Sequence, residues 1–176
     1  NCLRQTLLFG GLEAVAYNIN HQRPDLKLFE IGKCYSLTNE NGSQDPLNGY
    51  QEEIHLGLFL SGKLTRETWS EKQQSAGFFH MKGYVESLFN KLGFHKRQFR
   101  MEELENDLFS QGLRYRFKKH ILAELGLVHQ NLLDKLDIEN NVLYADLNWE
   151  ILMERAENNK VEYKEIPKFP QVRRDL

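Results

Sequence analysis

Cysteine is scarce in this chain of 176 residues, which contains only Cys2 and Cys34. There is no CxxC motif and no cysteine–histidine cluster, so the sequence predicts neither a disulfide framework nor a zinc site. No apolar run approaches the roughly 20 residues that a membrane span needs, and no signal peptide is visible. These absences predict a cytoplasmic protein without a membrane partner.

Motifs for nucleotide binding and hydrolysis are missing as well. The sequence contains no Walker loop, no GxGxxG and no GxSxG, and its six histidines form no HExxH pattern, so we expect no metal site. The formal net charge of −2 does not point to nucleic acid or to a membrane surface. The 40% hydrophobic content suits one globular domain. Because no initiator methionine is present, we expect the chain to be a piece of a longer protein.

What the chain does contain is hydrophobic periodicity, and this predicts an α+β fold. Apolar residues at helical spacing predict helices over residues 3–19, with a weak point at Gly10 and Gly11, and over 78–92. Further helices are expected at 129–138 and 150–156, and strands at 26–35, 54–62, 95–102, 113–126 and 141–149, with a turn at 110–112. Polar connections are expected at 38–53 and at 63–77, around Trp69. Hairpin-like links between strands favour an antiparallel sheet with helices on one face.

Glu30 is the least ordinary residue of the first strand. By alternation it shares one face with Leu28, Gly32 and Cys34. A carboxylate on a mostly apolar face needs a partner or a wet cleft, so a structural ion pair and a ligand-binding role both stay open. Cys34 has no activating base nearby in the sequence and is expected to be an inert core thiol.

A basic strand is the second feature with two interpretations. Arg114, Arg116 and Lys118 fall on one face with His120, and aromatic residues occupy the other face. Such a face can follow a phosphate backbone. It can equally be a half-exposed strand with solvated cations.

The order of these segments resembles a known family. The stretch “LRQTLLFGGLEAVAYNINHQRPDLKLFEIGKCY” (residues 3–35) resembles the class II synthetase-like domain of the bacterial phenylalanyl-tRNA synthetase beta chain. Further similar stretches are “HLGLFLSGK”, “FFHMKGYVESLFNKLGF”, “AELGLVHQNLLDKLDI” and “VLYADLNWEIL”. The resemblance implies a class II aminoacyl-tRNA synthetase catalytic-like core over residues 1–165. It implies that residues 166–176, “IPKFPQVRRDL”, lead into a C-terminal ferredoxin-like anticodon-binding domain.

The resemblance also implies that this domain is catalytically silent. Where active class II synthetases carry an arginine for the α-phosphate of ATP, this chain has Ser36, whose hydroxyl cannot supply the charge. The corresponding third motif lacks its glycines and carries Tyr144, Asp146 and Asn148 instead, and Arg155 follows too late to replace the motif's arginine. We therefore expect no catalytic, cofactor-binding or metal-binding residues.

The function implied is support of another chain. In the family, the alpha chain carries the active site, and an (αβ)₂ heterotetramer charges tRNA(Phe) with phenylalanine using ATP and magnesium. The first helix and a sheet edge are expected to contact the alpha chain, with Leu3, Leu7, Phe9 and Leu12 as candidates that could equally be core residues. With this resemblance, Arg114, Arg116 and Lys118 of the basic strand become candidate contacts for tRNA or for a partner subunit. Two alternatives stay open: an RNA-binding module based on that strand, and a residual adenylating enzyme.

Overall fold

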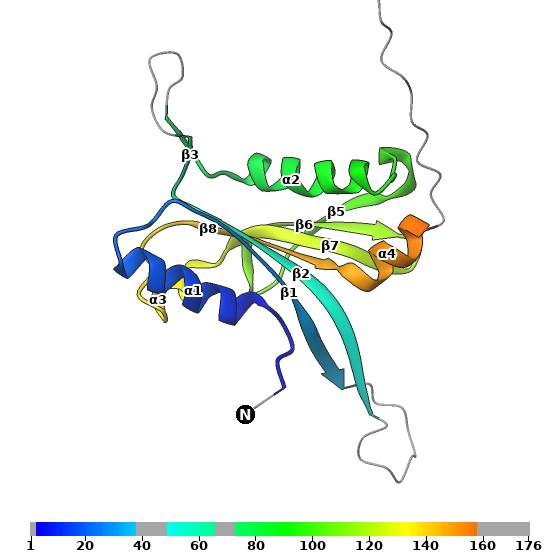
Figure 1. Ribbon diagram of the computed structural model, residues 1–176, viewed down its shortest axis with the longest axis horizontal. Coiled ribbons are helices and arrows are strands. Elements are labelled where there is room, and N and C mark those ends of the chain that lie inside the picture. Colours follow the sequence, from blue (N-terminus) through cyan, green and yellow to red (C-terminus); the bar gives the residue numbers. More distant parts are fainter. Residues whose placement is uncertain (1–2, 38–48, 66–72, 158–176) are drawn as a thin grey trace, which may run out of the picture.

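A six-stranded antiparallel sheet forms the centre of the molecule (Figure 1). The computed structural model describes residues 3–37, 49–65 and 73–157. The strand order is β1-β2-β8-β7-β6-β5, so that β1 and β5 are the two edges. The strands are β1 (Leu26–Leu37), β2 (Tyr50–Ser61), β5 (Arg100–Leu104), β6 (Phe109–Phe117), β7 (His120–Val128) and β8 (Val142–Asn148), and a separate small ribbon pairs β3 (Lys63–Thr65) with β4 (Gln74–Ser75).

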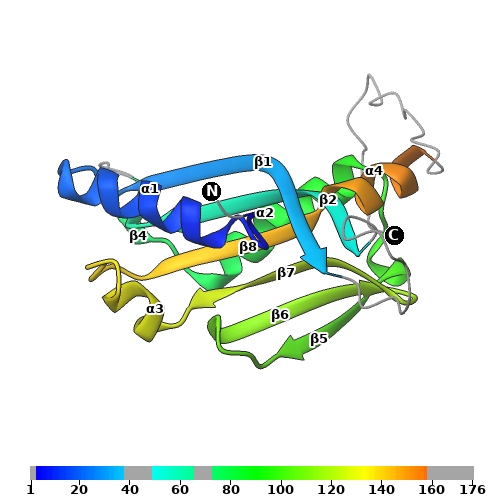
Figure 2. The same ribbon diagram turned by 90° about the horizontal axis from the view of Figure 1, so that it is seen from below.

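Helices cover both faces of the sheet, which corrects the expectation of helices on one face (Figures 1 and 2). The helices are α1 (Leu8–Asn20), α2 (Phe78–Lys91), α3 (Gln130–Asp134) and α4 (Trp149–Glu157), with a 3₁₀ turn, η1, at Lys96–Gln98. The physical reason is that both faces of the central strands are apolar. Leu56 and Leu60 of β2 enter a core with α2 and α4, whereas Phe59 enters a second core with α1 and α3.

Most predicted elements are present, but several boundaries differ. The single strand expected at 113–126 is a hairpin, because β6 ends at Phe117, residues 118–119 form a turn and β7 begins at His120. The strand expected at 95–102 begins only at Arg100, after the η1 turn. The first helix begins at Leu8 and not at residue 3, and the Thr6 hydroxyl accepts a hydrogen bond from the Leu8 N–H at 3.2 Å. The predicted turn at 110–112 is wrong, because these residues lie inside β6. The chain turns before them, where the Asn106 side chain accepts hydrogen bonds from the N–H groups of Leu108 and Phe109 at 3.1 and 3.0 Å. The loop predicted at 38–53 is wrong at its end, because β2 already begins at Tyr50, and residues 38–48 lie outside the described residues. Trp69 and the boundary between 165 and 166 also lie outside them.

The two glycines of α1 have different surroundings. Gly11 faces the sheet, where an added Cβ would overlap the ring of Phe59, while nothing lies within 4 Å of an added Cβ at Gly10. Gly11 therefore lets the helix lie directly on the Phe59 ring. The sequence predicted a weak point of the helix at Gly11, but the packing of the helix on Phe59 requires glycine there.

We expect Gly11→Ala to destabilise the chain by about 1–3 kcal/mol, because the new methyl group overpacks a filled core. Gly10→Ala is the matched control. It has free space and should be stabilising by about 1 kcal/mol, since alanine is the better helix former. Urea unfolding of both variants measures the difference, and equal effects at the two positions would contradict this packing.

Candidate functional site

Two neighbouring rows of residues, on the sheet face that α1 partly covers, differ in polarity. Each row is a series of direct cross-strand pairs that crosses all six strands. The apolar row consists of Leu28, Phe59, Tyr144, Gly126, Gly112 and Leu104. The next row, called the polar row below, consists of Glu30, Gly57, Asp146, Glu124, Arg114 and Glu102. The apolar row lies in the core under α1 and α3, and the polar row begins where that cover ends. This charged part of the face is the candidate site.

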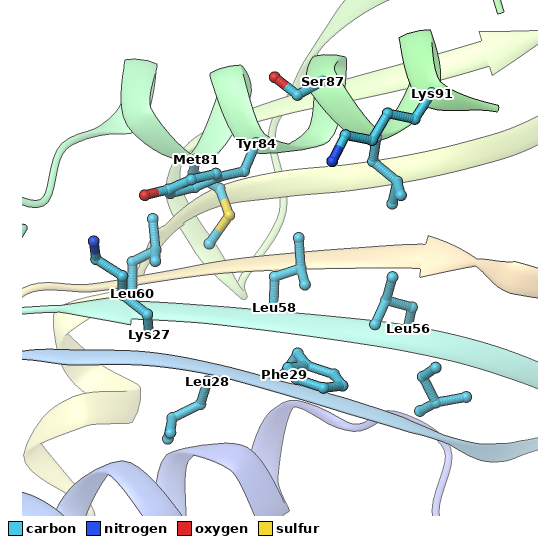
Figure 3. A pocket seen from close by; sticks show the side chains of 12 residues that line it. Lys27, Leu28, Phe29, Leu56, Leu58, Leu60, Met81, Tyr84, Ser87 and Lys91 are labelled. Atoms are coloured by element: carbon cyan, nitrogen blue, oxygen red, sulfur yellow. The ribbon is translucent and has the colours of Figure 1, made fainter. Parts of the chain in front are cut away.

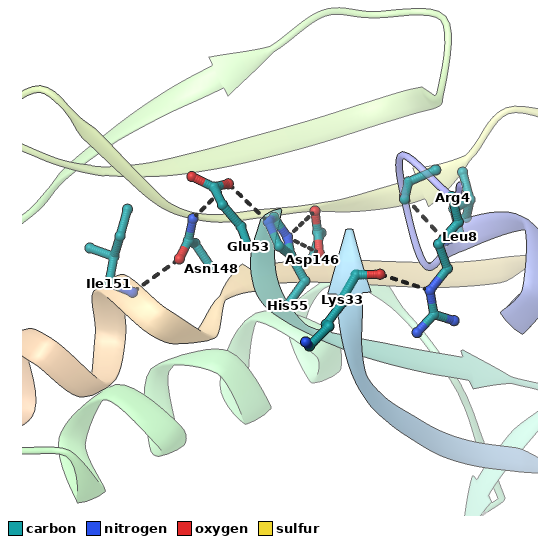
Figure 4. A network of polar contacts seen from close by, with 9 residues as sticks. Arg4, Leu8, Lys33, Glu53, His55, Asp146, Asn148 and Ile151 are labelled. Carbon is teal, nitrogen blue, oxygen red and sulfur yellow. Dashed lines mark hydrogen bonds and ion pairs between the residues drawn. The ribbon is translucent and has the colours of Figure 1, made fainter. Parts of the chain in front are cut away.

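His55 of β2 is at the centre of a hydrogen-bond network beside the polar row (Figure 4). Its Nδ1 lies 2.9 and 3.1 Å from the two carboxylate oxygens of Asp146, and its Nε2 lies 3.3 Å from Glu53. The Asn148 side chain donates to Glu53 at 3.2 Å, and its carbonyl oxygen accepts from the Ile151 N–H at 3.0 Å, where it caps α4. The network therefore joins β2, β8 and the start of α4, and its polar groups are directed at one another.

Two carboxylates control the charge of His55. Burial of the imidazole opposes protonation, but hydrogen bonds and charge from Asp146 and Glu53 outweigh it, so the pKa of His55 is raised above its ordinary value of 6.5. A raised folded-state pKa stabilises the fold fully below the unfolded pKa, and this contribution is lost as the pH rises through the folded-state pKa.

His55→Gln is therefore expected to destabilise the chain most at about pH 6, by about 1–2 kcal/mol, because charged hydrogen bonds are lost. The difference from the parent chain should shrink as the pH rises past the raised pKa. Urea unfolding between about pH 5.5 and 8.5 measures it. His21→Gln, which removes an exposed imidazole that contacts the backbone oxygen of Tyr17 and not a carboxylate, serves as the control. A constant penalty across this range would count against a charged His55.

Glu30 has a partner within the chain. Arg4 Nη1 lies 2.5 Å from Glu30 Oε1, and Arg4 Nε donates to the backbone oxygen of Lys33 at 2.9 Å. Both charged side chains are partly exposed, so the pair is worth little in stability. Of the two interpretations left open by the sequence, the structure provides the ion pair.

Tyr144 and Cys34 are buried beside the polar row. The Tyr144 ring is 4.8 Å from that of Phe59 between centroids, and burial raises its pKa above the ordinary range. Burial, followed by the charge of Asp146, raises the pKa of the Cys34 thiol to about 11, which fits the inert thiol expected from the sequence. Ser36 is exposed near the end of β1, opposite Gln51.

The structure separates the three cations of the predicted basic strand. Arg114 lies in the polar row, with its Nε and Nη2 atoms both 2.6 Å from Glu124 Oε1. Arg116 Nε is 3.3 Å from Glu102 Oε2. Lys118 is outside the strand, in the turn between β6 and β7, with a φ of 53°. Their role as tRNA or subunit contacts stays a prediction.

Sequence reasoning missed the network of Glu53, His55, Asp146 and Asn148 as a unit. Its signal was present, because “EIHLGLFL” and “LYADLN” each place ionisable residues at alternate positions of an apolar strand. What was missing is the register that brings β2 beside β8. Within 3–37, 49–65 and 73–157, no group of three or more His, Cys, Asp or Glu side chains is arranged to hold a metal ion. None of the helices described here is long and apolar enough to span a membrane.

Comparison with known proteins gives matches over the whole chain. A family described as “Phenylalanyl tRNA synthetase beta chain CLM domain” matches residues 1–149. The phenylalanine–tRNA ligase beta subunits of Bacteroides fragilis and Porphyromonas gingivalis are 42% and 33% identical over 178 aligned residues. Each alignment covers 100% of this chain but only 22% of the relative, so the chain spans about a fifth of their length.

A solved structure gives independent information on the fold. The pyrrolysyl-tRNA synthetase of Desulfitobacterium hafniense superposes with a TM-score of 0.62 over 90% of this chain and 51% of that one. Its sequence identity to this chain is 18%, so the likeness shows the fold alone. The α+β arrangement of antiparallel sheet and helices is therefore similar to that of this pyrrolysyl-tRNA synthetase.

Proposed function

The chain belongs to the phenylalanyl-tRNA synthetase beta chain family, and from this premise we propose that it is a structural, catalytically silent domain of the ligase's beta subunit. It supports the active site of an alpha chain in a cytoplasmic (αβ)₂ heterotetramer. The whole enzyme charges tRNA(Phe) with phenylalanine and uses ATP and magnesium. Because this chain spans about a fifth of its relatives, the remaining functions of the subunit belong to other parts of it.

The charge pairing in and beside the polar row supports the proposal that this domain is catalytically silent. A triphosphate needs unpaired cations, yet Arg4, His55 and Arg114 are each directed at a carboxylate of this chain. Glu53 adds a further negative charge beside His55. An incoming phosphate would therefore meet like charges and would have to break existing ion pairs. These residues do not fit ATP, and Ser36 brings no charge to the site.

Tyr144 supports the same conclusion by its size. It fills the centre of the sheet face where the third motif of active synthetases carries glycine, and its ring lies between those of Phe59 and Phe109. The backbone there is closed to a nucleotide by a packed side chain. The proposal that the domain is catalytically silent depends on one observation: this sheet face carries carboxylate-paired cations, and Tyr144 is packed at its centre.

Exposed apolar side chains mark the surface that we assign to the alpha chain. Of the four candidates named from the sequence, Leu7 and Leu12 are fully buried core residues, whereas Leu3 and Phe9 are exposed. At the sheet edge, Phe29 and Ile31 of β1 are 74% and 52% exposed. Large exposed apolar residues at one edge are typical of a surface that binds another protein.

Phe29 and Ile31 also line an apolar groove between β1, β2 and α2 (Figure 3). Leu58 of β2 and Met81 of α2 point into this groove from opposite sides. Its volume is about 470 Å³. A groove of this size can accept apolar side chains of a partner, and it extends the sheet-edge surface toward α2.

Co-expression of the parent beta subunit with its alpha chain tests the proposed role. We expect the two chains to co-purify as a heterotetramer that charges tRNA(Phe), and we expect the beta subunit alone to show no ATP–pyrophosphate exchange. Exchange by the beta subunit alone would favour the residual adenylating enzyme instead. Failure of the two chains to associate would remove the supporting role.

A further inference from the structure

A hollow at the β5 edge of the sheet is lined mainly by cations. Its lining residues are Arg97, Gln98, Phe99, Arg100, Arg116 and Lys118, and it is called the cationic hollow below. They come from the η1 turn, the start of β5, the end of β6 and the β6–β7 turn. The cavity volume is about 500 Å³, which is enough for a phosphate group with its ester substituents.

Positive charge is concentrated here although the chain as a whole is slightly acidic. Arg100 and Arg116 are direct cross-strand partners, an arrangement that is unfavourable for like charges unless an anion lies between them. Glu102 lies 3.3 Å from Arg116 and balances one of the charges. Among the described residues, no carboxylate is within ion-pair distance of Arg97, Arg100 or Lys118.

The Phe117 ring, which packs against the core and does not line the hollow, is approached by two cations. The Lys118 Nζ lies 5.5 Å from the centroid of the Phe117 ring, and Arg155 of α4 lies 5.8 Å from the same centroid. Arg155 also lies 3.8 Å from Glu154. The β6–β7 turn and the end of α4 thus direct two long cationic side chains to this end of the molecule.

We propose that the cationic hollow binds backbone phosphates of RNA. Arg97, Arg100 and Lys118 are exposed and can follow a phosphate chain, and long cationic side chains supply the sequence-independent part of RNA affinity. Phe99 packs against the core with Phe89 and Tyr115, so it is not free to stack on a base. The hollow therefore recognises charge and not sequence. The identification of this RNA as tRNA rests on the proposed function.

This site differs from the basic strand expected from the sequence. Arg114 is excluded, because both of its contacts go to Glu124. The hollow instead includes Arg97 of η1 and Arg100 of β5, the strand before β6. Only the pairing of β5 with β6 brings them beside Arg116.

The test is tRNA binding by the assembled heterotetramer whose beta subunit carries Arg97→Gln and Arg100→Gln. We expect roughly threefold to tenfold weaker binding at about 50 mM salt, and a slope of log K against log salt that is reduced by about 1–2 between 50 and 200 mM. The matched control is Arg23→Gln with Lys135→Gln, which removes two exposed cations far from the hollow. It should bind tRNA as the parent does.

Other outcomes decide against the site. An unchanged salt slope would overturn it while leaving the proposed supporting role intact, provided that the heterotetramer assembles. Weaker assembly with unchanged tRNA binding would show that the hollow contacts an acidic protein surface. Inorganic phosphate at millimolar concentration provides the second arm, and we expect it to compete with tRNA and to shrink the difference between parent and variant. Phosphate binding that is lost in the variant while tRNA binding stays unchanged would show that the hollow takes free phosphate and not the RNA backbone. If no heterotetramer forms, tRNA binding by the beta subunit alone decides the site.

Discussion

Replacing Phe29 and Ile31 together by aspartate is expected to abolish co-purification of the beta subunit with the alpha chain. Both residues are more than half exposed on an edge strand and line the apolar groove. In an interface they would be desolvated, and a buried carboxylate at each position would have no partner. At about 2 kcal/mol for each such contact, association would weaken about a thousandfold. Affinity of the purified chains for each other measures this effect.

The matched control replaces two exposed apolar residues elsewhere. Phe79 of α2 is 80% exposed and Met101 of β5, on the opposite edge, is 48% exposed. Phe79→Asp with Met101→Asp makes the same change in charge and in apolar surface, and it should leave association intact. Loss of association with the control pair and not with the β1 pair would place the interface on another surface.

Phe59→Ala is expected to destabilise the fold by about 3–5 kcal/mol, the range for removing a buried aromatic ring. Phe59 is 1% exposed, lies 4.8 Å from Tyr144 between ring centroids, and is covered by α1 at Gly11. Phe59 therefore links the first helix to the sheet and packs against Tyr144. The free energy of unfolding in urea gives the loss.

A double-mutant cycle separates the contact of Phe59 with Gly11 of α1 from the general loss of buried apolar surface in Phe59→Ala. Gly11→Ala is costly because its methyl group meets the Phe59 ring, and that cost should disappear in the Phe59→Ala background. Additive effects of the two substitutions would contradict the direct packing of Gly11 on Phe59.

Several elements were predictable because one local pattern determined each of them. The helix Phe78–Lys91 has apolar residues at helical spacing, and Gly93, with a φ of 79°, follows its end. The strand at Leu26–Leu37 was found, with a longer C-terminal end, from its apolar alternation. The family was identified from the order of whole segments, which is more specific than any single motif.

The arrangement of these elements was not predictable to the same extent. Alternation shows that a strand such as β2 has two apolar faces, but not that a separate helix covers each face. The polar row depends on the register of five strand pairs, which the sequence does not show. The ion-pair partner of Glu30 is Arg4, which lies 26 positions away in the sequence. The Ser110–Gly112 segment has the composition of a turn, yet Gly112 allows β6 to pass close to Leu104 inside the sheet.

The number of ATP molecules bound by the assembled heterotetramer tests the central claim most directly. Equilibrium dialysis with a non-hydrolysable ATP analogue gives the stoichiometry. Because Arg4, His55 and Arg114 are paired with carboxylates of this chain and Tyr144 is packed in the core, the proposed silent role predicts one analogue for each αβ pair, bound by the alpha chain. Two analogues for each αβ pair, with the second one lost on substitution of residues in the polar row, would contradict the silent role of this domain.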